Sequence, residues 1–270
     1  MSMFTPLELI YPVVSRRSGG LSLGVDLFPD RKTCNFDCPY CEIFPYSGEP
    51  PFRPEDLDRE LAEFFEVEYP SFPPDLPLRD LTLSGSGEPT LSPHLGSALA
   101  SIRAARDRWA PGADLVVITN SSTLGQPETA DLLGSCVDEA GLRIWAKLDG
   151  GNEDRYAEMS RSPVPFRDLV EGILSFTSAH AVIIQTMLCA LDGRGPSGSD
   201  LSDYARLLKS LLGRGARFLE IHLYTQARPS PEGRTSPLPD RDLMDAAGLV
   251  AGSVPGIPIR VFGRAGELSR

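Results

Sequence analysis

Apolar runs rich in β-branched residues alternate along this chain with segments whose apolar residues recur at helical spacing. Seven runs predict β-strands, at residues 21–28, 80–84, 115–119, 143–148, 181–188, 218–224 and 257–262. Helical stripes lie between them, as at Leu57, Leu61, Phe64 and Phe65. This alternation is typical of βα units joined by right-handed crossovers, so it predicts an α/β fold whose parallel sheet is wound into an open or closed barrel.

One face of several predicted strands is polar, although a parallel strand covered on both faces should be apolar throughout. In the run at 218–224, Glu220, His222 and Tyr224 share a face. Other pairs that share a face in this way are Gln185 with Cys189, Lys147 with Asp149, and Ser22 with Asp26. Buried polar groups cost free energy unless they are paired or bound. These faces therefore form either a self-contained hydrogen-bond network or the lining of a ligand-filled barrel, and we expect the second.

Composition and charge narrow the class of protein. The chain has 270 residues, 41% of them hydrophobic, and its Pro-rich stretches interrupt βα units, so we expect one domain over residues 1–270. With 26 basic and 37 acidic side chains the net charge is −11, which argues against nucleic acid as a partner. Residues 1–17 lack the pattern of an export leader, and no apolar run reaches the roughly 18 residues of a membrane helix. We expect a cytoplasmic protein with no membrane partner.

Three of the five cysteines lie within eight residues, in the run Cys34-Asn-Phe-Asp-Cys38-Pro-Tyr-Cys41 directly after the first predicted strand. Thiolates are the ligands that an iron-sulfur cluster requires, and three of them leave one iron of a [4Fe-4S] cluster open to another ligand. The alternative is a zinc site completed by a histidine, but all three histidines are far away in the sequence and there is no second CxxC pair.

A second motif follows the next predicted strand, where Leu81-Thr-Leu-Ser-Gly-Ser-Gly-Glu-Pro-Thr90 enters a glycine-rich turn. Glycine lets a backbone approach a ligand closely, and the carboxylate of Glu88 can accept a hydrogen bond from an ammonium group. The alternative is an ordinary glycine-rich βα loop.

Together the two motifs resemble the signature of the radical S-adenosylmethionine superfamily. The resemblance implies a partial (β/α)6 barrel, a [4Fe-4S] cluster on Cys34, Cys38 and Cys41, and S-adenosylmethionine bound at the open iron. The variant of the second motif looks most like a branch of iron-sulfur oxidoreductases that includes the wyosine-forming tRNA synthases. Further matches run from about residue 20 to residue 263.

The resemblance also implies a set of cofactor-binding residues. These are Tyr40 near the adenine, the turn of Gly85, Ser86, Gly87 and Glu88 at the methionyl amino group, Asn120 near the ribose, Lys147 at the carboxylate, Asp149 at the ribose or amino group, and, as a weaker match, Gln185. The pair Lys147 and Asp149 has a plainer alternative, a salt bridge within the barrel.

The implied activity is reductive cleavage of S-adenosylmethionine to methionine and a 5′-deoxyadenosyl radical, which takes hydrogen from a small-molecule or peptide substrate. An electron donor such as flavodoxin or ferredoxin is then required. Two other functions stay open: an activating enzyme that installs a radical on a partner protein, and an iron-sulfur electron-transfer protein without turnover.

The chain departs from the wyosine-type branch in two ways. No cysteine precedes Cys34, so the additional cysteines of that branch are missing, and the acidic balance argues against tRNA as the substrate. Of the two remaining cysteines, Cys136 falls on a helical stripe and is expected in the core. Cys189 shares a face with Gln185 and is either a small buried residue or a catalytic thiol that returns a hydrogen atom to a substrate radical.

Overall fold

The computed structural model describes residues 9–268, and its residues group into two compact units that interleave along the chain. Unit 1 comprises Met1–Cys34, Pro45–Thr119 and Ser135–Arg143, and unit 2 comprises Asn35–Phe44, Asn120–Gly134 and Ile144–Arg270. Part of the segment expected to lack an export leader, residues 1–8, lies outside the described residues. The single domain over 1–270 stays a prediction.

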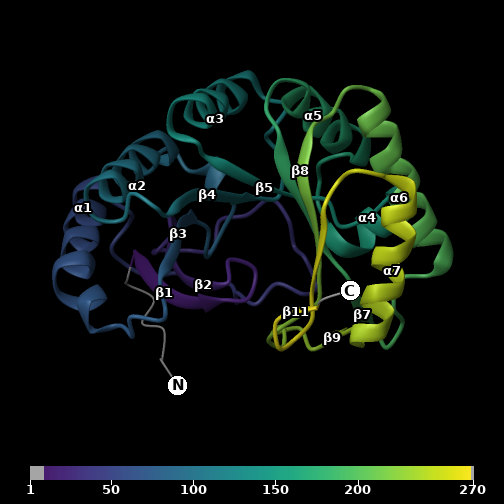
Figure 1. The fold of residues 1–270 in the computed structure, drawn as a ribbon, viewed down its shortest axis with the longest axis horizontal. Helices are drawn as coiled ribbons and strands as arrows, with labels where there is room; N and C mark the ends of the chain where they lie inside the picture. The colour runs from purple at the N-terminus through teal and green to yellow at the C-terminus, as the bar shows by residue number, and fades with distance from the viewer. Residues whose placement is uncertain (1–8, 269–270) are drawn as a thin grey trace. The chain divides into compact units, whose positions relative to one another are not determined.

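Unit 1 is a sheet in the order β1-β2-β3-β4 with helices beside it (Figure 1). Its strands are β1 (Ile10–Ser15), β2 (Gly20–Val25), β3 (Leu78–Leu83) and β4 (Asp114–Thr119). Its helices are α1 (Pro54–Glu63), α2 (Leu95–Trp109) and the short turns η1 (Phe64–Glu68), η2 (Tyr69–Ser71) and η3 (Pro89–Leu91). Strand β1 is antiparallel to β2, while β2, β3 and β4 run parallel, which is the pairing expected of successive βα units.

Unit 2 carries parallel strands in the order β5-β6-β8-β10, followed by an antiparallel β11. These strands are β5 (Arg143–Lys147), β6 (Val182–Met187), β8 (Phe218–Tyr224), β10 (Ile259–Phe262) and β11 (Glu267–Leu268). A separate antiparallel pair is formed by β7 (Cys189–Leu191) and β9 (Thr235–Pro237). The helices are α3 (Pro127–Ala140), whose last residues belong to unit 1, α4 (Glu153–Ser160), α5 (Phe166–Ala179), α6 (Gly198–Gly213) and α7 (Asp240–Ser253).

All seven predicted strands are present, with ends that differ by at most three residues. The structure adds β1, β7, β9 and β11. Strand β1 contains Pro12, which cannot donate to a ladder and is tolerated because β1 is an edge strand paired only with β2 among the described residues. The predicted stripe is confirmed across α1 and η1, since Leu57, Leu61 and Phe64 are fully buried.

The polar faces of the strands are hydrogen-bonded to one another in both units. In unit 2 the Gln185 amide nitrogen lies 2.7 Å from His222 Nδ1, and His222 Nε2 lies 2.6 Å from Glu220 Oε2. In unit 1 the hydroxyls of Ser22 and Thr82 both donate to Asp80 Oδ1. The self-contained network that the sequence left open is therefore present at these positions, and the lining of a ligand-filled barrel stays a prediction.

Among residues 9–268, no helix is both long and apolar enough to cross a membrane.

Candidate functional site

The cysteine loop is held by side-chain and backbone hydrogen bonds to segments far along the chain rather than by a helix or strand of its own. Asn35 Oδ1 accepts a hydrogen bond of 2.7 Å from Asn120 Nδ2, and Asn35 Nδ2 donates to Ser122 Oγ at 2.9 Å. The backbone N–H of Asp37 donates to the carbonyl of Ser160 at 2.8 Å. Asn120, which the resemblance places near a ribose, is thus tied to the residue that follows the first cysteine.

The three thiols of this loop suit an iron-sulfur cluster by their donor chemistry. Cys34, Cys38 and Cys41 are all half-buried and free of disulfides. Soft thiols within eight residues of one loop match the ligands that such clusters take. Within residues 9–268, no group of three or more His, Cys, Asp or Glu side chains has the spacing of a metal site, so the fit rests on the kind of donor and on the loop.

The glycine-rich turn packs against the segment that leads into the cysteine loop. The Glu88 N–H donates to the carbonyl of Thr33 at 2.8 Å, so the turn is hydrogen-bonded to the residue before Cys34. A Cβ on Gly87 would lie 2.1 Å from the Thr33 oxygen, which is shorter than any real contact, so only glycine fits. The backbone pairing therefore places the glycine-rich turn beside the residue that precedes Cys34, within unit 1.

Gly85 and Ser86 are fixed by a buried carboxylate at the end of β2. Gly85 has a φ of +126°, and a Cβ there would lie 2.7 Å from Asp26 Cγ. The Ser86 N–H donates to Asp26 Oδ2 at 3.0 Å. Burial raises the pKa of Asp26, although the hydrogen bonds from Ser86 and Phe28 work in the opposite direction.

Glu88 is 2% exposed, and one of its carboxylate oxygens is used in hydrogen bonds within the protein. Its Oε1 accepts hydrogen bonds from the Thr90 N–H at 3.2 Å, from the Thr90 hydroxyl at 2.6 Å and from the Thr119 hydroxyl at 2.7 Å. The side chain thereby caps η3 and ties it to β4. A role for Glu88 in binding an ammonium group stays a prediction.

Lys147, Asp149 and Tyr40 form a buried cluster at the carboxyl end of β5. Lys147 Nζ donates to the Tyr40 hydroxyl at 2.6 Å and lies 3.5 Å from Asp149 Oδ2, to which the Tyr40 hydroxyl also donates. Asp149 Oδ1 accepts a hydrogen bond of 2.7 Å from the Met187 N–H. The structure thus brings together three predicted cofactor residues, and it contains the salt bridge that was the alternative for two of them.

Charge determines the protonation of this cluster. Burial alone would lower the pKa of Lys147, but the negative charge of Asp149 raises it above the usual lysine value, so the ammonium group keeps its charge at neutral pH. Burial, and then the charge of Asp149, raises the pKa of Tyr40 well above its usual range. A fixed cation beside a neutral phenol can attract a carboxylate.

Two buried glutamines, one within β6 and one after β8, differ in how their amides are satisfied. Gln185, a predicted cofactor residue, is fully buried and bonded to His222. Gln226, two residues beyond β8, is 2% exposed, and neither its amide oxygen nor its amide nitrogen has a partner among the described residues. An unpaired buried amide costs about 1 to 3 kcal/mol, so it indicates a site for a bound polar group. The only sequence signal for Gln226 is its position after a predicted strand.

Cys189 begins β7 and does not extend the strand that contains Gln185, because β6 ends at Met187. Its thiol is fully buried in an apolar cluster with Tyr40, Met187 and Tyr224, against which Cys38 also packs. Burial raises the pKa of the Cys189 thiol to about 12, so it stays protonated at neutral pH. The other candidate core cysteine, Cys136, is half-buried rather than buried.

Comparisons with solved structures show the fold. A radical SAM methyltransferase from Sphaerobacter thermophilus aligns with 97% of this chain and 79% of its own at a TM-score of 0.62 and 15% sequence identity. Streptococcus suis SuiB, in a structure bound to S-adenosylmethionine, aligns with 92% of this chain at a TM-score of 0.59 and 12% identity, and the chain spans about half (49%) of that protein. The predicted α/β partial (β/α)6 barrel is confirmed.

Comparisons with curated proteins show the family. No protein-family model matches the chain. A UPF0026 protein of Helicobacter pylori (strain J99) is 26% identical over 95% of this chain and 78% of its own length. The UPF0026 protein slr1464 of Synechocystis is 30% identical over 289 aligned residues, which cover 96% of this chain and 97% of the relative. On its sequence and over nearly its whole length, the chain belongs to the UPF0026 protein family.

Proposed function

We propose that this protein is a radical S-adenosylmethionine enzyme of the oxidoreductase type, in which Cys34, Cys38 and Cys41 hold a [4Fe-4S] cluster. When bound, the cluster supplies the electron that splits S-adenosylmethionine into methionine and a 5′-deoxyadenosyl radical, which takes a hydrogen atom from the substrate. The observation that carries the proposal is the backbone pairing of the Glu88 N–H with Thr33, because it sets the glycine-rich turn beside the start of the cysteine loop. The fold shared with a radical SAM methyltransferase and with a protein that binds S-adenosylmethionine supports it.

In this proposal the chain's own residues bind and orient the cofactor. Lys147 offers a fixed positive charge for the carboxylate of the cofactor, and Asp149 and Tyr40 hold the ammonium group of Lys147 in place. The turn of Gly85, Ser86, Gly87 and Glu88 is assigned to the methionyl amino group, with Asn120 and Gln185 as further cofactor residues. We add Gln226, because its unpaired buried amide offers two N–H donors and an acceptor oxygen to a ligand.

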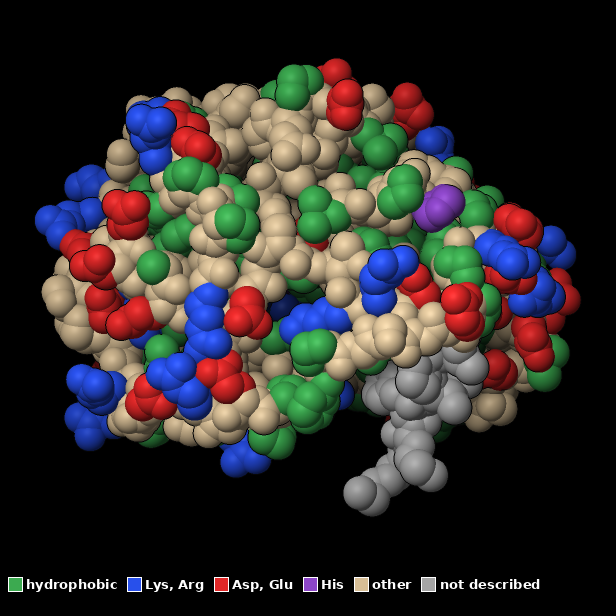
Figure 2. Space-filling model, turned by 180° about the vertical axis from the view of Figure 1, so that it is seen from behind, with side chains coloured by type: hydrophobic (Ala, Val, Ile, Leu, Met, Phe, Trp, Pro, Cys, Tyr) green, Lys and Arg blue, Asp and Glu red, His purple; other side chains and the backbone are tan. Residues whose placement is uncertain are grey.

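The branch and the substrate are proposed from the second motif and from the charge of the chain. The second motif favours a relationship to wyosine-type enzymes, but the net charge of −11 disfavours tRNA. On the face drawn in Figure 2, basic side chains lie among acidic ones and gather into no extended basic area of the part shown in colour. We therefore propose a small-molecule or peptide substrate.

The remaining partners follow from the chemistry. One-electron reduction of the cluster requires a donor such as flavodoxin or ferredoxin, and free thiols fit the reducing cytoplasm.

The first experiment tests the cluster and its chemistry in protein purified without oxygen. We expect about four irons per chain, and 5′-deoxyadenosine when dithionite and S-adenosylmethionine are added. Alanine in place of Cys34, Cys38 or Cys41 should remove most of the iron, whereas Cys136→Ala, the matched control, should retain it. Stoichiometric zinc in place of iron would overturn the proposal. An intact cluster that releases no 5′-deoxyadenosine would favour the electron-transfer alternative, and release that requires a copurifying large protein would favour the activating enzyme.

A second experiment tests the cofactor residues through binding alone. Lys147→Met removes the charge and keeps most of the apolar stem, so S-adenosylmethionine should bind at least tenfold more weakly by calorimetry, since a charge-assisted contact contributes about 1.5 to 3 kcal/mol. Lys209→Met, on the exposed side of α6, is the matched control and should bind as the wild type does. Equal affinities of the two variants would remove Lys147 from the site.

A further inference from the structure

Four arginines line a cavity of about 350 Å³ in unit 2. They are Arg155, Arg161, Arg194 and Arg234, and three carboxylates, those of Glu158, Asp192 and Asp200, share the lining with them. The lining side chains thus carry a net charge of +1 in a chain whose total is −11. Several guanidinium groups around one cavity offer N–H donors in the geometry that carboxylate and phosphate groups accept.

The chain builds this cavity from a tight turn and a short helix. After β7, Asp192 and Gly193 have positive φ angles of 51° and 77°, and the backbone groups of Leu191 and Arg194 are hydrogen-bonded to each other. Two consecutive positive φ values are typical of a type I′ turn, for which Asp-Gly is a favoured sequence. The turn places Arg194 on the rim, while Arg155 comes from the first turn of α4.

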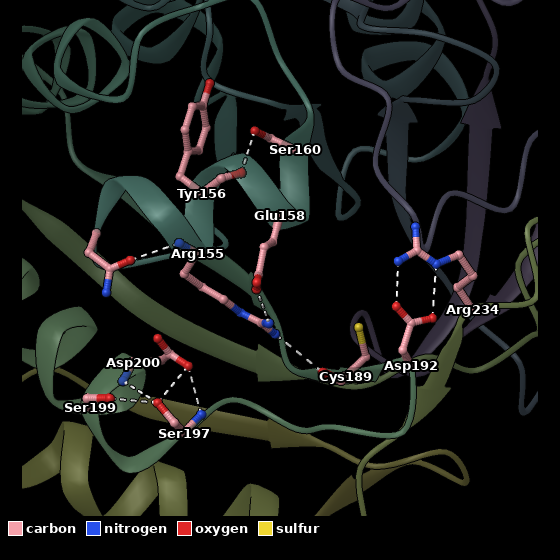
Figure 3. Close-up of polar contacts among 11 residues, drawn as sticks. Arg155, Tyr156, Glu158, Ser160, Cys189, Asp192, Ser197, Ser199, Asp200 and Arg234 are labelled. Atoms are coloured by element: carbon pink, nitrogen blue, oxygen red, sulfur yellow. Dashed lines mark hydrogen bonds and ion pairs between the residues drawn. The ribbon is translucent and has the colours of Figure 1, made fainter.

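The buried arginine of the cavity has weak partners. The Arg155 side chain is 7% exposed, and its Nη1 lies 3.2 Å from an oxygen of Glu158, whose side chain is 57% exposed. Its Nη2 donates to the carbonyl of Cys189 at 3.4 Å (Figure 3). A guanidinium has five N–H donors, and a buried one is stabilised by close, bidentate anion contacts that these two do not supply.

The other three arginines of the cavity differ in how their guanidinium groups are paired. Arg234 is paired through two nitrogens with Asp192 (Figure 3), and Arg161 and Arg234 both contact Glu232. The guanidinium of Arg194 makes no hydrogen bond or ion pair with residues 9–268. One arginine of the cavity is therefore free to reorient towards a bound anion.

We propose that this cavity binds a small molecule through a carboxylate or phosphate group, with Arg155 as its buried partner and Arg194 as its partner at the rim. The incoming oxyanion replaces the exposed Glu158 carboxylate as the partner of Arg155. It accepts hydrogen bonds from the guanidinium N–H groups that have no other partner. On the proposed function, this small molecule is the substrate. Arg155 donates a hydrogen bond to the backbone carbonyl of Cys189, and the Cys189 thiol lies in the apolar cluster with Tyr40. Cys189 therefore links an anion bound to Arg155 with that cluster.

The test measures anion binding directly and needs neither cluster turnover nor S-adenosylmethionine. Inorganic phosphate and succinate are titrated separately into the anaerobically purified protein by calorimetry, in chloride buffer at constant ionic strength. We expect saturable binding of at least one of the two at one site per chain, and the anion that binds more tightly identifies the group. No saturable binding of either anion would overturn the proposal.

Two variants locate the site. Arg194→Gln should weaken binding at least tenfold without loss of stability, because the side chain is exposed and its guanidinium unpaired. Arg155→Gln should abolish binding. The matched control is Arg167→Gln, whose side chain is 88% exposed on α5 outside the cavity, and it should bind as the wild type does.

Undiminished binding by a folded Arg194→Gln protein would overturn the assignment even if Arg155→Gln fails to fold. Because 5′-deoxyadenosine release is measured separately, a failure of the cavity and a failure of the radical chemistry give different results.

Discussion

Removing one charge of the buried pair at the end of β5 should cost the protein several times more stability than the same change at an exposed pair. In Asp149→Asn, the ammonium group of Lys147 keeps its charge and loses its anion, at side-chain exposures of 19% for Lys147 and 7% for Asp149. At the observed 3.5 Å and an effective dielectric constant of about 20, the lost attraction is about 5 kcal/mol. The asparagine oxygen can still accept from Tyr40 and Met187, so we expect a net loss of about 3 kcal/mol in the free energy of unfolding.

Urea unfolding of the cluster-free protein, followed by circular dichroism, measures this loss. The matched control is Asp114→Asn, which breaks an ion pair of 2.8 Å with Arg143 at exposures of 52% and 34% and should cost less than about 1 kcal/mol. The raised pKa of Lys147 means that its stabilisation is fully present below the unfolded lysine pKa of about 10.4 and is lost only above it. Without Asp149, burial lowers the pKa of Lys147, so the difference between wild type and Asp149→Asn should be no larger at pH 9 than at pH 7. Equal losses in the two variants would refute the reasoning.

Three further changes test other parts of the structure. Gly87→Ala forces a methyl group against the Thr33 carbonyl and should lower the melting temperature by several degrees, equivalent to about 2 kcal/mol or more. Gly248→Ala, in the interior of α7 with open space around it, should be neutral or stabilising. A loss of the same size at both positions would contradict the packing argument. Cys189→Ser should keep the cluster and still release 5′-deoxyadenosine but stall product formation once a substrate is known, and a normal product yield would assign the thiol to packing alone. At physiological salt, tRNA should show no specific binding in a filter assay, and submicromolar affinity would reverse the conclusion drawn from charge.

The regular secondary structure and the position of the cysteine loop could be predicted from the sequence alone. The strands could be predicted because β-branched runs and helical stripes are local signals, and the three cysteines could be singled out because their spacing is short. Strand β1 was missed because Pro12 and its edge position weaken the strand pattern. Strands β7 and β9, of three residues each, are too short for a periodicity to be visible.

The contacts of the site depend on residues far apart in the chain, which no single-sequence pattern reports. Tyr40 and Lys147 are 107 residues apart, and their contact follows from the packing of a loop on a strand end. The unpaired amide of Gln226 becomes visible only when every neighbour is placed. The arginine cavity is equally hidden, because each of its arginines resembles any other surface arginine in the sequence.

The pairing of Gln185 with His222 leaves the imidazole with no lone pair to offer. An amide nitrogen can only donate, so Nδ1 of His222 is the acceptor and its proton resides on Nε2, which donates to Glu220. Edge contacts with Trp145 and Phe262, at centroid distances of 5.5 and 5.2 Å, hold the ring in this orientation. To ligate a metal ion through Nδ1, the ring would have to give up the Gln185 hydrogen bond. His222, a histidine of the barrel wall, therefore has a structural role and is not available as the fourth ligand of a zinc site.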